Sequence, residues 1–172
     1  MRLWATLPED FAGLSLLNRG FGGSTLSECV QVMERVLFHH EPRALVLYAG
    51  ENDLDQGASP EHVRDLFQEF MHRFSARLGT VPVVFISVKP SPARVWVAAN
   101  IRRANELVRD AAAAWQQVHF LDVHRLMLDA QGNGRRELFL DDWLHMSRAG
   151  YALWAEQLRG KFRQLGLMPM PL

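Results

Sequence analysis

Cysteine is almost missing from this chain. Cys29 is the single cysteine among 172 residues, so an internal disulfide framework is excluded. Lysine is also scarce, at positions 89 and 161 only, and the arginines that carry most of the positive charge are spread along the chain. Nineteen basic residues balance nineteen acidic ones. The charge pattern therefore predicts no nucleic-acid partner and no attraction to an acidic membrane surface.

Long apolar runs are absent as well. No run reaches the roughly 18 residues that a membrane-spanning helix needs, and the N-terminus lacks the basic and apolar regions of an export signal. We therefore expect a cytoplasmic protein without a membrane span, unless an export signal precedes Met1. The composition is 48% hydrophobic and 22% charged, which is ordinary for a globular protein. The length suits a single domain over residues 1–172 with a sizeable core.

Residues 44–49 form an apolar run without alternation, which is typical of a parallel strand that is covered on both faces. Residues 81–88 indicate another buried strand, and residues 118–123 indicate a third strand. A shorter run, Leu14–Leu17, is interpreted as the end of another strand.

Segments with helical periodicity separate these runs. Thr25 and Glu28 fit a capping box before the first of them. The predicted helices lie at about 26–37, 60–78, 101–115 and 148–165. Strands that alternate with helices of this length predict an α/β fold with a parallel sheet and helices on both faces.

Three loops of unusual composition follow or flank the strand ends. They are residues 18–24, 50–59 and 138–146. Ligands of open parallel sheets bind beyond the carboxyl ends of the strands. We therefore expect these three loops to converge on one site.

The third loop carries Asp142 and His145 just before a helix. A carboxylate three residues from an imidazole can accept its Nδ1 proton and leave Nε2 free as a base. The two residues could instead bind a metal, but no third or fourth ligand follows at metal-site spacing. The acid–base interpretation is favoured, with no metal.

The first two loops offer hydrogen-bond donors. The glycines at 20, 22 and 23 fit a tight turn, a phosphate-binding loop or a backbone donor at Gly23, but their spacing matches no nucleotide-binding fingerprint. Asn52 could donate its amide to a developing negative oxygen or simply serve a turn. Asp53 is interpreted as tying down its own loop.

A nucleophile is harder to assign. Ser24 stands at a helix start and is better explained as a cap, and Cys29 is better explained as a core residue. Ser87 lies in a predicted strand, and Ser147 most simply caps the last helix. None of the four is a persuasive catalytic nucleophile.

Together, three segments resemble the SGNH (GDSL-type) hydrolase family in order and spacing. They are NRGFGGST, GENDL and DWLHMSRAGY. The resemblance implies a flavodoxin-like three-layer α/β/α sandwich that hydrolyses small-molecule esters or thioesters through a Ser-His-Asp triad, without a cofactor. It implies that His145 is the base and Asp142 its partner, and that Gly23 and Asn52 form the oxyanion hole.

The family's first block, which holds the nucleophilic Ser at the end of the central first strand, has no counterpart here. The chain starts at Met1, and residues 2–4 resemble the segment just after that block. We therefore expect the Ser and the first strand to lie upstream of Met1. The alternative is a truncated, inactive relative that serves as a small-molecule binding or interaction module.

Overall fold

The computed structural model describes residues 1–169, and its centre is a sheet of three parallel strands. The strands are β1 (Leu45–Leu47), β2 (Val83–Ile86) and β3 (Val118–Leu121), in the order β1-β2-β3. The three strands predicted at residues 44–49, 81–88 and 118–123 are confirmed, each somewhat shorter than predicted. The strand predicted at Leu14–Leu17 is wrong: the segment forms no strand, and Leu17 is 66% exposed. An apolar run becomes a strand only when a neighbouring strand pairs with it, and none of the described strands does.

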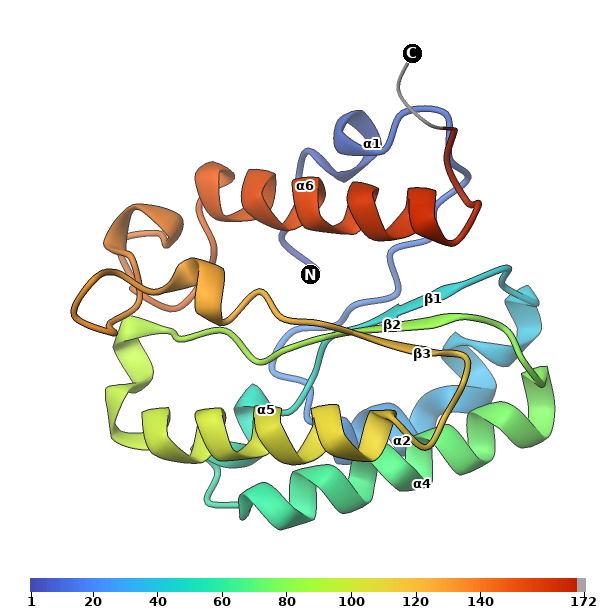
Figure 1. The fold of residues 1–172 in the computed structure, drawn as a ribbon, viewed down its shortest axis with the longest axis horizontal. Coiled ribbons are helices and arrows are strands. Elements are labelled where there is room, and N and C mark those ends of the chain that lie inside the picture. The colour runs from blue at the N-terminus through green and yellow to red at the C-terminus, as the bar shows by residue number, and fades with distance from the viewer. Residues whose placement is uncertain (170–172) are drawn as a thin grey trace.

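Helices cover both faces of this sheet (Figure 1). One face carries α2, α4 and α5, and the other carries α6 with α1 above it. The helices are α1 (Leu7–Asp10), α2 (Leu26–Val36), α3 (Glu51–Asp55), α4 (Pro60–Leu78), α5 (Ala98–Ala112) and α6 (Arg148–Gln164). Short 3₁₀ segments are η1 (Phe38–His40), η2 (Pro92–Val97), η3 (Arg125–Met127) and η4 (Arg136–Leu138). The predicted three-layer α/β/α architecture is therefore confirmed. Within residues 1–169, no helix is long and apolar enough to cross a lipid bilayer.

The central strand β2 divides the core in two. Val83 and Phe85 pack with residues of α2, α4 and α5, whereas Val84 and Ile86 pack with residues of α6 and the N-terminal segment. All four side chains are fully buried. A strand covered on both faces needs apolar residues at every position, which explains the unbroken apolar run in the sequence.

Caps fix where the helices begin. The predicted capping box is present: Thr25 accepts from the backbone of Glu28, and the Glu28 carboxylate accepts from the Thr25 backbone. Ser147 caps α6 as predicted, accepting from Gly150 N at 3.2 Å. Because α6 begins directly after the loop with Asp142 and His145, this cap also fixes the end of that loop.

Candidate active site

Asp142 and His145 form a closed turn at the start of α6. The Nδ1 atom of His145 lies 2.5 Å from Asp142 Oδ2, and Asp142 Oδ1 accepts from the backbone of Leu144 and His145, both at 2.9 Å. The hydrogen bond from His145 first, and then the two backbone donors, lower the pKa of Asp142 to about 2. Both side chains are about half exposed. An ionised Asp142 that accepts the Nδ1 proton leaves Nε2 of His145 able to accept a proton.

This turn is tied to the segment that follows β2. Leu140 N donates to the carbonyl of His145 at 2.7 Å, and Ala93 N donates to the carbonyl of Trp143 at 3.0 Å. Trp143 has a positive φ of 59°, which is rare for a bulky residue and costs backbone free energy. Its ring lies under the guanidinium of Arg136, 4.7 Å from the centroid. The turn that carries His145 is therefore anchored to the first residues of η2.

The predicted oxyanion donor Asn52 contacts the loop that carries the other one, Gly23. Asn52 Nδ2 donates to the carbonyl of Ser24, the residue after Gly23, at 2.8 Å. Gly23 has a φ of +73°, a left-handed conformation that favours glycine. The segment 50–59 was predicted to be a loop, but its first part is the helix α3, which begins after Gly50 at φ +109°. Asn52 therefore projects from a regular element rather than from a turn.

Asp53 does not tie down its own loop, and this interpretation is wrong. Its carboxylate accepts from the backbone of Leu26 at 2.7 Å and of Ser27 at 3.4 Å. These are orphan donors in the first turn of α2, where a negative charge is favourable. Asp53 thus joins α3 to the beginning of α2, next to the loop that carries Gly23.

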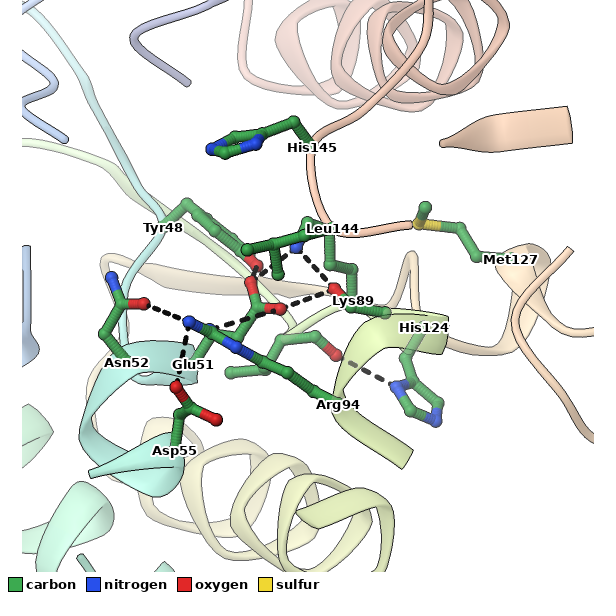
Figure 2. A network of polar contacts seen from close by, with 12 residues as sticks. Tyr48, Glu51, Asn52, Asp55, Lys89, Arg94, His124, Met127, Leu144 and His145 are labelled. Carbon is green, nitrogen blue, oxygen red and sulfur yellow. Dashed lines mark hydrogen bonds and ion pairs between the residues drawn. The ribbon is translucent and has the colours of Figure 1, made fainter. Parts of the chain in front are cut away.

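A buried polar network that sequence analysis missed lies beside Asn52 (Figure 2). The carboxylate of Glu51 accepts from Tyr48 Oη at 2.6 Å, from Lys89 Nζ at 2.5 Å and from Ser91 Oγ. Glu51 and Lys89 are each 6% exposed. Burial alone would raise the pKa of Glu51, but the Lys89 charge and the hydrogen bonds from Lys89, Ser91 and Tyr48 together outweigh it, so the pKa is lowered and Glu51 is ionised. The scarcity of lysine was the available signal, since one of two lysines directly follows a buried strand.

Arg94 connects this network to Asn52. Its guanidinium donates to Asn52 Oδ1 at 2.8 Å and lies 3.2 Å from an oxygen of Asp55 and 3.5 Å from one of Glu51. The Arg94 side chain is only 11% exposed. Figure 2 shows the guanidinium between these three acceptors. Each cation in this group therefore faces at least one carboxylate, as buried charges require.

The structure joins one pair of the predicted site residues directly. His145 contacts Asp142, whereas Asn52 contacts the carbonyl of Ser24, the residue after Gly23, and no hydrogen bond among residues 1–169 joins His145 to Asn52. The two contacts are linked through adjacent residues of η2. Ala93 anchors the turn of His145, and Arg94 binds the amide of Asn52.

The other candidate residues are engaged elsewhere. Ser24 is not the helix cap that was predicted, because Thr25 is the cap and Ser24 Oγ donates to Phe21 O. Burial raises the pKa of Cys29 to about 11, which keeps it a thiol. Ser87 is buried and accepts from the backbone of His124. Among the described residues, no group of three or more His, Cys, Asp or Glu is arranged to hold a metal ion.

Residues 2–153 match the GDSL-like Lipase/Acylhydrolase family. The chain belongs to this family. The resemblance of its three sequence blocks to the SGNH (GDSL-type) hydrolases is thereby confirmed.

Individual relatives agree with that assignment. The GDSL-like chain is 30% identical over 150 residues to the platelet-activating factor acetylhydrolase IB subunit alpha1 of Bos taurus. The aligned residues cover 83% of this chain and 61% of the relative. It is similarly 30% identical to the Pongo abelii protein of the same name, covering 84% of this chain and 62% of that relative. The chain thus spans about three fifths of the length of these relatives.

Solved structures show the same fold at lower identity. A GDSL-like lipase from Bacteroides thetaiotaomicron superposes with a TM-score of 0.79 at 17% identity, covering 93% of this chain and 81% of that one. The lipase/acylhydrolase from Enterococcus faecalis gives a TM-score of 0.71 at 21% identity, covering 87% and 75%. These likenesses confirm the α/β/α hydrolase fold of the GDSL-like chain.

Proposed function

We propose that this chain carries the base and the oxyanion donors of a serine esterase that cleaves small-molecule carboxylic esters. The observation that carries the proposal is the contact between His145 Nδ1 and the ionised Asp142, in a turn anchored beside the segment that holds Asn52. Such a pair is the acid–base part of a Ser-His-Asp triad. The family match supports hydrolysis and does not favour a non-catalytic binding module.

The nucleophile of the proposed triad is a Ser upstream of Met1, in a polypeptide longer than these 172 residues. The length of the curated relatives is compatible with such an extension. The amino group of Met1 is near the site: burial first, and then the Lys89 charge, lower its pKa to about 6.

In the proposed reaction the Ser oxygen attacks the ester carbonyl carbon while His145 Nε2 accepts its proton. Asp142 stabilises the imidazolium, and the Gly23 N–H and Asn52 Nδ2 donate to the oxyanion. When the tetrahedral intermediate collapses, His145 returns the proton to the departing alcohol. Water then repeats the sequence on the acyl-enzyme and releases the acid. Loss of one oxyanion donor is expected to reduce the rate by about 10²–10³-fold.

The acetyl group is the first acyl group to test, because the bovine and orangutan relatives are named acetylhydrolases. The experiment measures hydrolysis of p-nitrophenyl acetate and butyrate by two proteins. One is the 172-residue chain, and the other is the same chain extended by the codons that precede Met1 in frame. We expect hydrolysis by the extended chain.

Two histidine variants of the extended chain decide the role of His145. His145→Ala is expected to abolish hydrolysis with the circular dichroism spectrum unchanged. His39→Ala is the matched control, since this exposed histidine lies in η1, and it is expected to keep full activity. Full activity of His145→Ala refutes the proposal. Activity of the 172-residue chain that His145→Ala removes refutes the upstream Ser and points to an internal nucleophile, with Ser24 the first to test.

A further inference from the structure

The amide of Asn52 has two chemically different ends of nearly the same shape. In the structure, Nδ2 faces the carbonyl of Ser24, and Oδ1 faces the guanidinium of Arg94 (Figure 2). We propose that Arg94 is a positioning residue that fixes this orientation and so keeps Nδ2 available as an oxyanion donor. The inference rests on the proposed function in one respect, namely that Asn52 donates to the substrate oxygen.

The partners on the two sides select a single orientation. The Ser24 carbonyl can only accept a hydrogen bond, and the Arg94 guanidinium can only donate. Rotating the amide by half a turn would place Oδ1 against the Ser24 oxygen and the NH₂ group against a cation. Both contacts would then be repulsive. The bond from Arg94 is charge-assisted and is therefore the stronger of the two that hold the amide.

Arg94 also acts on the electrons of the amide. A cation bound to Oδ1 draws charge toward the oxygen and makes the N–H groups at Nδ2 better donors, as in other linked hydrogen bonds. Nδ2 carries two hydrogens, and Ser24 uses one of them. The second hydrogen is the one proposed to bind the oxyanion.

The guanidinium is itself held in place. Asp55 and Glu51 flank it at 3.2 Å and 3.5 Å, and burial to 11% exposure removes most competing water. A planar guanidinium can donate to Asn52 while it forms ion pairs with both carboxylates, because its five donors point in fixed directions. A lysine would retain the positive charge but not the planar arrangement of several donors. Arg94→Lys therefore separates the charge of Arg94 from its geometry.

The first test does not depend on hydrolysis. The side-chain NH₂ signals of Asn52 are recorded by ¹H–¹⁵N NMR on the 172-residue chain and assigned by their loss in Asn52→Asp. Arg94→Met and Arg94→Lys are expected to shift this pair and to increase its exchange with water at least several-fold. Arg103→Met is the matched control, because Arg103 is a half-exposed arginine of α5 paired with Glu61 and Glu106, and it is expected to leave the pair unchanged.

Unchanged Asn52 signals in either folded Arg94 variant overturn the inference. If Arg94→Met does not fold, Arg94→Lys decides, since it keeps a cation beside Glu51 and Asp55. If the wild-type protein hydrolyses no ester, the proposed function fails, and the NMR result still decides whether Arg94 orients Asn52.

The second test uses the extended, active chain. Arg94→Lys is expected to lower kcat by about 10–100-fold with little change in KM, because the oxyanion exists only after attack and one donor is worth about 10²–10³-fold. In an Asn52→Ala background, Arg94→Lys is expected to lower kcat by less than about twofold. Equal losses in both backgrounds would show that Arg94 acts without Asn52 and would overturn the inference.

Discussion

Replacement of Glu51 by glutamine tests the buried network directly. Glu51 accepts from Tyr48, Lys89 and Ser91 and also faces Arg94 at 3.5 Å. Glutamine has nearly the same volume but no charge, and one of its two polar ends can only donate. The substitution therefore leaves the Lys89 ammonium without its anion in a site that is 6% exposed. No cavity is created, so the change isolates the electrostatic contribution.

The expected loss of stability is large. Removing one partner of a buried ion pair costs about 3–5 kcal/mol, and we expect about 3 kcal/mol because glutamine can still accept from one donor. For a domain of this length, 1 kcal/mol corresponds to about 2–4 °C in Tm, so Tm should fall by about 6–12 °C. Glu69→Gln is the matched control. Glu69 pairs with Arg73 on the surface of α4, where an ion pair contributes about 0.3–0.5 kcal/mol and its loss should lower Tm by about 1–2 °C.

Thermal unfolding followed by circular dichroism measures both variants across pH. The native pKa of Glu51 is lowered, so its contribution is fully present above the unfolded value of about 4.5 and is lost as pH falls through the native pKa. The Tm difference between wild type and Glu51→Gln should therefore shrink below about pH 4.5. Adding Lys89→Met should recover part of the loss by removing the unpaired cation. The reasoning is refuted if Glu51→Gln has the same Tm as the Glu69→Gln control, or if the Tm difference between wild type and Glu51→Gln stays constant down to acid pH.

Three further predictions concern the helix and the base. Gly150→Ala should destabilise the protein by about 1–3 kcal/mol, because the added Cβ would lie 2.3 Å from the Leu138 carbonyl oxygen. Gly160→Ala in the same helix should stabilise the protein by about 0.5–1 kcal/mol, because its Cβ would meet no atom within 4 Å. Urea unfolding measures both, and equal effects would contradict the close approach. Asp142→Asn should lower ester hydrolysis of the extended chain by up to about 10⁴-fold, and wild-type rates in this variant would remove Asp142 from the mechanism. The Asp142 carboxyl should titrate by ¹³C NMR at about pH 2, and a midpoint at or above 3.8 would contradict its hydrogen bonds to His145 and the backbone.

The fold was predictable wherever the pattern was local. Strands covered on both faces leave unbroken apolar runs, and caps such as Thr25 with Glu28 act over a single helical turn, so both can be read along the chain. Leu14–Leu17 failed because its composition resembles that of a strand while strand formation depends on a partner elsewhere. The short helix α3 was missed because five residues do not establish a period.

In the candidate site, too, contacts between residues close in sequence could be predicted and contacts between distant residues could not. Asp142 and His145 are three residues apart, and their contact follows from the local turn. Lys89 and Glu51 are 38 residues apart, and Arg94 and Asn52 are 42 apart. Nothing in the sequence near either residue indicates its partner, since the pairing arises only because parallel strands end at one edge of the sheet. Asp53 was assigned to its own loop for the same reason, although its partners lie 26 and 27 residues away.

The buried network also limits how this sequence can change during evolution. Loss of Glu51 leaves the buried Lys89 ammonium without its carboxylate, and loss of Lys89 or Arg94 removes one of the two cations that face Glu51. A descendant can leave this arrangement most readily by exchanging Glu51 and Lys89 together, or by first acquiring stability elsewhere in the chain. The exposed pair of Glu69 and Arg73 carries no such restriction and can drift one residue at a time. Substitutions at the three network positions are therefore expected to be coupled among homologues.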